Sequence, residues 1–120
     1  MPSIQGLLDR ARELGESIAA HERVQAYFAA QRAVGQDPAA QQILREYGQH
    51  VQHIRELERA QRPIEVADKQ KLAELESRIA GNEQLKGLAR VQADYVELMD
   101  QINSAMGAPL AALAQPEGGA

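Results

Sequence analysis

The sequence predicts an all-α protein, a bundle of four to five helices that is intertwined or packed as a homodimer. Hydrophobic residues make up 44% of the 120 residues but aromatic residues only 3%. The core must therefore come from Leu, Ile, Val, Ala and Met, whereas β-rich folds rely on β-branched and aromatic side chains. Apolar residues also recur at helical spacing, most regularly from Asn82 to Met106. A chain of this length forms one domain.

The N-terminal third carries two apolar stripes that differ in direction. After Ser3, a residue type that caps helices, the first stripe consists of Ile4, Leu7, Ala11, Leu14 and Ile18. The stripe weakens beyond Ala20, where His21 follows, and a rotated stripe continues through Val24, Phe28 and Val34. Residues 3–34 therefore form either one long bent helix or two helices that meet near His21.

Glycine, proline and capping residues set the remaining boundaries. Gly35 ends the N-terminal region, and Asp37-Pro38 begins a helix that runs to about Gln61, because aspartate caps a helix and proline is tolerated at its first position. Pro63 separates this helix from a shorter one over residues 64–80.

The last helix follows Gly81-Asn82 and has the most regular stripe in the chain. Its members are Leu85, Leu88, Gln92, Tyr95, Met99, Ile102 and Met106. Tyr95, Met99 and Ile102 are predicted to be buried. Gly107 and Pro109 are predicted to end the helix, which divides the chain into a helical domain at 1–106 and a flexible tail at 107–120.

Composition excludes several classes of function. There is no cysteine, so disulfides, thiolate metal sites and cysteine nucleophiles are ruled out. Seventeen acidic against thirteen basic residues give a net charge of −4, which argues against a dedicated nucleic-acid binder. The sequence has neither an apolar run long enough to span a membrane nor a signal pattern, and it predicts a cytoplasmic protein.

Few side chains are candidates for chemistry. Glu46, His50 and His53 are spaced by four and three residues and could bind zinc or iron as a small metal- or ligand-binding bundle, although a structural site usually needs about four ligands. Solvated His and Glu on a helix surface are the commoner arrangement.

Three arginines near the end of one helix, Arg55, Arg59 and Arg62, could contact phosphate or RNA, but cations at a helix C-terminus offset the macrodipole and are the stronger explanation. Three tyrosines, Tyr27, Tyr47 and Tyr95, could line a ligand pocket, but such rings are more often buried in a helix interface. Neither a nucleophile motif nor a phosphate loop occurs, so we expect no enzyme, no catalytic residue and no cofactor.

Several runs, taken in order, resemble one bacterial family. They are Ala11–Ile18 (ARELGESI), Asp37–Leu44 (DPAAQQIL), Gly81–Lys86 (GNEQLK) and the pattern Gln92-x-x-Tyr95-x-x-Leu98-Met99-x-x-Ile102. In these the chain resembles the YlbF/YmcA family of small helical proteins, which includes the YheA-like members. The resemblance implies self-association and non-enzymatic regulation, linked to competence, sporulation, biofilm formation and mRNA processing by ribonuclease Y. Iron–sulfur clusters associated with some members are held by cysteines and cannot transfer to this chain.

We therefore expect a regulatory or scaffolding protein that acts by helix contacts with itself and with a protein partner of unknown identity. Long thin helices in a small chain leave apolar stripe uncovered unless a second copy covers it. The residues expected in the core or in this interface are Ile4, Leu7, Leu14, Ile18, Phe28, Val34, Tyr95, Met99 and Ile102. Neither a membrane nor direct nucleic-acid contact is expected.

Overall fold

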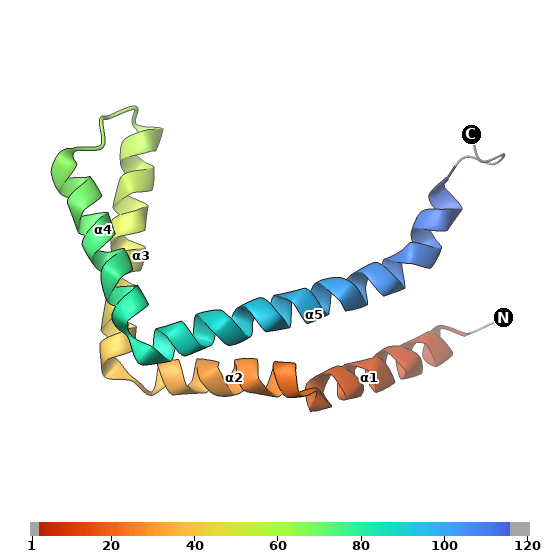
Figure 1. Ribbon diagram of the computed structural model, residues 1–120. Helices are drawn as coiled ribbons and strands as arrows, with labels where there is room; N and C mark the ends of the chain where they lie inside the picture. Colours follow the sequence, from red (N-terminus) through yellow and green to blue (C-terminus); the bar gives the residue numbers. More distant parts are fainter. Residues whose placement is uncertain (1–2, 116–120) are drawn as a thin grey trace. The chain divides into compact units, whose positions relative to one another are not determined.

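Within residues 3–115, which the computed structural model describes, the chain forms five α-helices and no strand (Figure 1). The helices are α1 (Ile4–Ala20), α2 (Glu22–Gly35), α3 (Pro38–Arg59), α4 (Val66–Gly81) and α5 (Glu83–Ala114). The all-α prediction is confirmed, and the homodimer stays a prediction.

Tertiary contacts divide the described residues into two compact units. The α1–α5 unit consists of residues 3–27 and 91–115, and the α3–α4 unit of Phe28–Arg90. Helices α2 and α5 each contribute one part to each unit.

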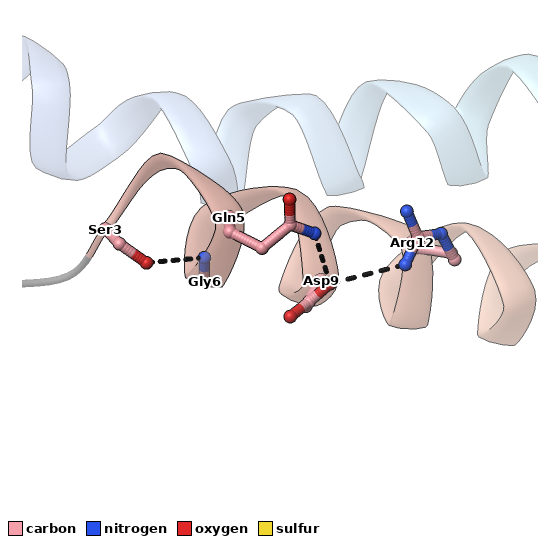
Figure 2. Close-up of polar contacts among 5 residues, drawn as sticks. All are labelled: Ser3, Gln5, Gly6, Asp9 and Arg12. Carbon is pink, nitrogen blue, oxygen red and sulfur yellow. Dashed lines mark hydrogen bonds and ion pairs between the residues drawn. The ribbon is translucent and has the colours of Figure 1, made fainter.

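In the α1–α5 unit, α1 is an amphipathic helix that lies alongside α5 (Figures 1 and 2). The Ser3 hydroxyl accepts a hydrogen bond from the Gly6 N–H at 3.0 Å, which caps α1 as predicted. One face of α1 is polar, where Asp9 Oδ1 accepts from Gln5 Nε2 at 3.0 Å and from Arg12 Nη1 at 3.3 Å (Figure 2). The apolar stripe occupies another arc of the helix.

His21 separates α1 from α2, so the alternative of two helices is the correct one. Its backbone is extended, with φ −72° and ψ 139°, and cannot continue α1. Its Nδ1 accepts a hydrogen bond from the Arg23 N–H at 3.1 Å. The imidazole thus satisfies a free donor at the start of α2, as a capping side chain does.

The core of the α3–α4 unit consists of Val34, Ala40, Ile43 and Leu85, with Ile79 and Leu88 packed against it. Asp37 caps α3 through a hydrogen bond from the Ala39 N–H to its Oδ1 at 3.0 Å, and Pro38 follows as the first helical residue. Helix α3 then packs along α4. Leu75 of α4, only 2% exposed, is buried within this unit.

The connection between α3 and α4 begins at a residue with a positive φ. Gln61 has φ 57°, its N–H donates to the Glu58 carbonyl at 3.1 Å, and the Arg62 N–H donates to the Leu57 carbonyl at 2.8 Å. This pair of bonds is the Schellman motif, in which glycine usually holds the left-handed position. Helix α3 therefore ends at Arg59, and α4 begins at Val66, each within two residues of its predicted boundary.

The predicted end of the last helix at Gly107 and Pro109 is wrong, because α5 continues to Ala114. A proline inside a helix removes one N–H donor and displaces one carbonyl, which a kink can relieve. Helix α5 changes direction in its C-terminal turns (Figure 1), and the alanines around Pro109 favour helix. The division into a domain and a flexible tail stays a prediction, and residues 116–120 lie outside the described range.

Candidate interaction surface

Helix α1 has no buried residue, although its apolar side chains share one stripe. At about 100° per residue, Ile4, Leu7, Leu8, Leu14 and Ile18 fall within an arc of roughly 120°. Exposure falls along this stripe, from 78% at Ile4 to 55% at Leu7 and 37% at Leu14, and Ile18 is half-buried. The N-terminal end of the stripe is therefore the part that the chain itself covers least.

The stripe of α5 shows the same trend in the opposite direction along the chain. Tyr95, Met99 and Ile102 are half-buried, and the Tyr95 ring stacks on Tyr27 with centroids 4.4 Å apart and planes 6° apart. The same stripe continues at spacings of four and three residues to side chains that are 52%, 68% and 83% exposed, namely Met106, Leu110 and Leu113. Coverage of the stripe thus ends beyond Ile102.

The uncovered ends of both helices are free of charge. Residues 3–8 and 101–115 contain no Asp, Glu, Lys, Arg or His. Charged side chains begin at Asp9 on α1 and end at Asp100 on α5. Since a solvated helix surface normally carries charges, these neutral ends have the composition of a contact surface.

The residues predicted for the core or interface separate into three groups. Val34 lies in the core of the α3–α4 unit. The half-buried group consists of Ile18, Tyr95, Met99 and Ile102. Burial of Tyr95, Met99 and Ile102 was predicted, and the structure covers them only in part. The exposed group consists of Ile4, Leu7, Leu14 and Phe28. An interface role for the exposed group stays a prediction. Leu110 and Leu113 were not among the predicted interface residues, because Gly107 and Pro109 were expected to end the helix, although their spacing from Met106 continues the helical stripe.

The structure does not assemble Glu46, His50 and His53 into a metal site. His50 Nε2 lies 2.8 Å from the Asp68 carbonyl oxygen, and His53 Nε2 lies 3.2 Å from Asp68 Oδ1. Glu46 Oε2 is 2.8 Å from Arg78 Nη1, an ion pair whose angles are not those of a hydrogen bond. Among the described residues, no three His, Cys, Asp or Glu side chains are placed to hold a metal ion.

These side chains instead join α3 to α4. They line a half-open depression of about 400 Å³, bordered by Glu46, Gln49, His50, His53, Asp68 and Lys71. His50 is 5% exposed and its ring nitrogen is satisfied by the Asp68 backbone, so it is a buried polar group with a partner. Asp68 also accepts a hydrogen bond from the Glu65 N–H at 3.2 Å as part of a capping box. This cluster stabilises the helix pair.

Comparison with known proteins identifies the family of this chain. Residues 7–111 match the family described as control of competence regulator ComK, YlbF/YmcA. The chain belongs to the YlbF/YmcA family. This match confirms the resemblance noted in the sequence, and the family is described as one of regulators.

A solved structure shares the fold. RicA of Bacillus subtilis, crystallised in complex with RicF, superposes with a TM-score of 0.77 at 16% sequence identity, over 94% of this chain and 100% of that one. No curated protein matches the sequence. None of the described helices is long and apolar enough to cross a membrane.

Proposed function

We propose that this protein is a non-enzymatic regulatory or scaffolding protein that acts through helix-to-helix contact with itself and with a protein partner. The observation that carries the proposal is the exposed apolar stripe of α1, a helix with no buried residue in the isolated chain. Family membership supports it, because the family is one of regulators. The complex of RicA with RicF gives a relative of the same fold that binds another protein.

The pathway follows by analogy with the family. We place the protein in the cytoplasm, as a regulator in the class that governs competence, sporulation, biofilm formation and ribonuclease Y-dependent mRNA processing. With no cysteine in the chain, its contribution does not pass through a thiolate-held cluster. Protein contact is then the mode of action, and the partner is a protein with an apolar helical surface.

Capture from the native host tests the proposal. Tagged wild type is compared with a Leu7→Glu/Leu14→Glu variant, whose charges fall on the apolar stripe, and with a Gln5→Glu/Arg12→Glu control, whose changes fall on the polar face. We expect wild type and control to retain the same partner proteins and the stripe variant to lose them at least tenfold. Circular dichroism verifies that all three remain helical. Equal recovery of partners by the stripe variant would contradict the proposal.

A further inference from the structure

We propose that Tyr27 and Tyr95 form an oxidative cross-linking site, at which a one-electron oxidant joins the two rings as dityrosine. Tyr27 lies on α2 and Tyr95 on α5, and both belong to the α1–α5 unit. The new bond therefore ties together two segments of this unit that lie far apart in the sequence. The inference goes beyond the proposed function and does not rest on it, because it concerns a modification within one chain.

The geometry of the two rings favours coupling. Their centroids lie 4.4 Å apart and their planes differ by 6°, at the short end of the range of about 4.5–7 Å for stacked aromatic pairs. Parallel rings at this distance are in van der Waals contact. The ring torsion of a tyrosine is soft, so the carbons beside the two hydroxyl groups can meet by side-chain rotation, without movement of either helix. Both side chains are half-buried, which leaves part of each ring within reach of a small oxidant.

Composition directs one-electron oxidation to tyrosine. Cysteine, tryptophan and tyrosine are the side chains that give up a single electron most readily, and this chain has no cysteine and no tryptophan. Methionine reacts instead by taking up an oxygen atom. The chain has three tyrosines, and the third, Tyr47 on α3, stacks on no other tyrosine within the described residues. Within one chain, two tyrosyl radicals are therefore in contact only at Tyr27 and Tyr95.

The reaction balances with one class of co-reactant. Each phenol gives one electron to the oxidant, which is thereby reduced, and its hydroxyl proton to water. The two phenoxyl radicals pair their electrons in one new carbon–carbon bond between the ring carbons ortho to the oxygens. The hydrogen on each joined carbon is then transferred to the neighbouring oxygen as the rings become aromatic again. The pair has lost two electrons and two protons in total, which consumes two equivalents of a one-electron oxidant such as a peroxidase intermediate or nitrogen dioxide.

The cross-link changes the stability of the unit that contains it. A covalent bond between positions distant in the sequence restricts the unfolded chain and so stabilises the folded one. In the α1–α5 unit, α1 has no buried residue, and Tyr27 and Tyr95 are themselves only half-buried. Oxidation thus adds a covalent tie to a unit whose helices bury little surface against each other.

Photochemical oxidation of the purified protein tests the site. The wild type is illuminated at low micromolar concentration with tris(bipyridine)ruthenium(II) and persulfate, which generate one-electron oxidants. Tyr27→Phe and Tyr95→Phe each keep a ring in the stack but remove one phenol, and Tyr47→Phe is the matched control. We expect wild type and Tyr47→Phe to give dityrosine fluorescence in chains of monomeric size, and the other two variants to give at least tenfold less. Circular dichroism verifies that all four proteins remain helical.

Mass spectrometry locates the bond. Trypsin places Tyr27, Tyr47 and Tyr95 on three different peptides, so the cross-link appears as a peptide pair that is lighter than its two members by two hydrogen atoms. We expect the pair to contain Tyr27 and Tyr95. Oxidised wild type, but not oxidised Tyr27→Phe, should also melt a few degrees higher than before oxidation. In concentrated urea, where the stack is lost, the yield within single chains should fall severalfold.

Three results would overturn the inference. They are a yield of dityrosine within single chains that Tyr95→Phe leaves unchanged, a cross-link that maps to Tyr47, and a wild type that gives none while free tyrosine in the same mixture couples. Each of these leaves the capture of host partners untouched, so failure here is distinguishable from failure of the proposed function.

Discussion

At the scale of single residues, backbone conformation and burial decide which side chains are constrained. Gln61 takes a left-handed conformation, with φ 57°, at the end of α3. The sequence predicted a break near this position from Arg62-Pro63, but it could not place the left-handed residue, because no glycine marks it. His50 illustrates the same limit, since its partner is a backbone carbonyl at Asp68, eighteen residues away.

Gln61→Gly should stabilise the protein. A non-glycine residue in this conformation costs about 1–2 kcal/mol, which the substitution removes. Glycine also gives the unfolded chain more conformational freedom, and this lowers the gain in stability by about 0.5–1 kcal/mol. The expected net gain is about 0.5–1 kcal/mol, seen as a rise of a few degrees in Tm. Gln52→Gly, on the exposed face in the middle of α3, should instead lose about 1 kcal/mol. Equal losses in both variants would rule out strain at Gln61.

Leu75→Ala should be among the most damaging apolar truncations in the α3–α4 unit. Leu75 is 2% exposed, and its truncation should cost about 2–5 kcal/mol from lost transfer energy and a cavity. Val66→Ala in the same helix removes an apolar side chain that is 69% exposed and should change stability by less than about 0.5 kcal/mol. Urea unfolding of both variants measures the difference, and a near-neutral Leu75→Ala would mean that the site refills.

At the scale of helices, local chemistry predicted most starts and missed one end. Ser3, Asp37 and Asn82 each cap the helix that follows them, as predicted from residue type. Pro109 was predicted to stop α5, yet the helix passes through it to Ala114. A start depends on one side chain and its neighbouring N–H groups. The end of a helix depends on whether the following residues have a lower free energy in the helix than outside it. That balance involves several residues and cannot be predicted from one of them.

Asn82→Ala should weaken the junction between α4 and α5. Asn82 Oδ1 accepts from the Leu85 N–H at 3.0 Å, and loss of such a cap costs about 0.5–2 kcal/mol. Asn82→Asp keeps the acceptor and should retain stability, because a negative charge is favourable at a helix N-terminus. Asn103→Ala, at an exposed interior position of α5, should be neutral or slightly stabilising. Thermal unfolding of the three variants should therefore single out Asn82→Ala, and equal midpoints would contradict the capping role.

At the scale of the whole molecule, the two units differ in how completely each buries its own apolar side chains. The α3–α4 unit has its own core at Val34, Ala40, Ile43 and Leu85, whereas α1 buries none of its residues. Periodicity predicted both sets of apolar stripes, since spacing is local. It could not predict which stripe the chain covers, because coverage depends on contacts between distant segments. For the same reason, spacing along α3 could not reveal that Glu46 pairs with Arg78 of α4.

Hydrogen exchange should therefore depend on protein concentration in one part of the chain only. If a second copy covers the ends of α1 and α5, mass action stabilises them, by about 2.7 kcal/mol when free protein reaches a hundredfold excess over Kd. Peptides covering residues 8–14 and 104–114 should exchange more slowly as concentration rises from below to above Kd, while those from α3 (Pro38–Arg59) should not change. Mass spectrometry measures both sets in one experiment, and Leu110→Glu should abolish the dependence. Exchange slows only where association suppresses local opening. If exchange slows in α3 but not in residues 104–114, the dimer contact lies in the α3–α4 unit instead.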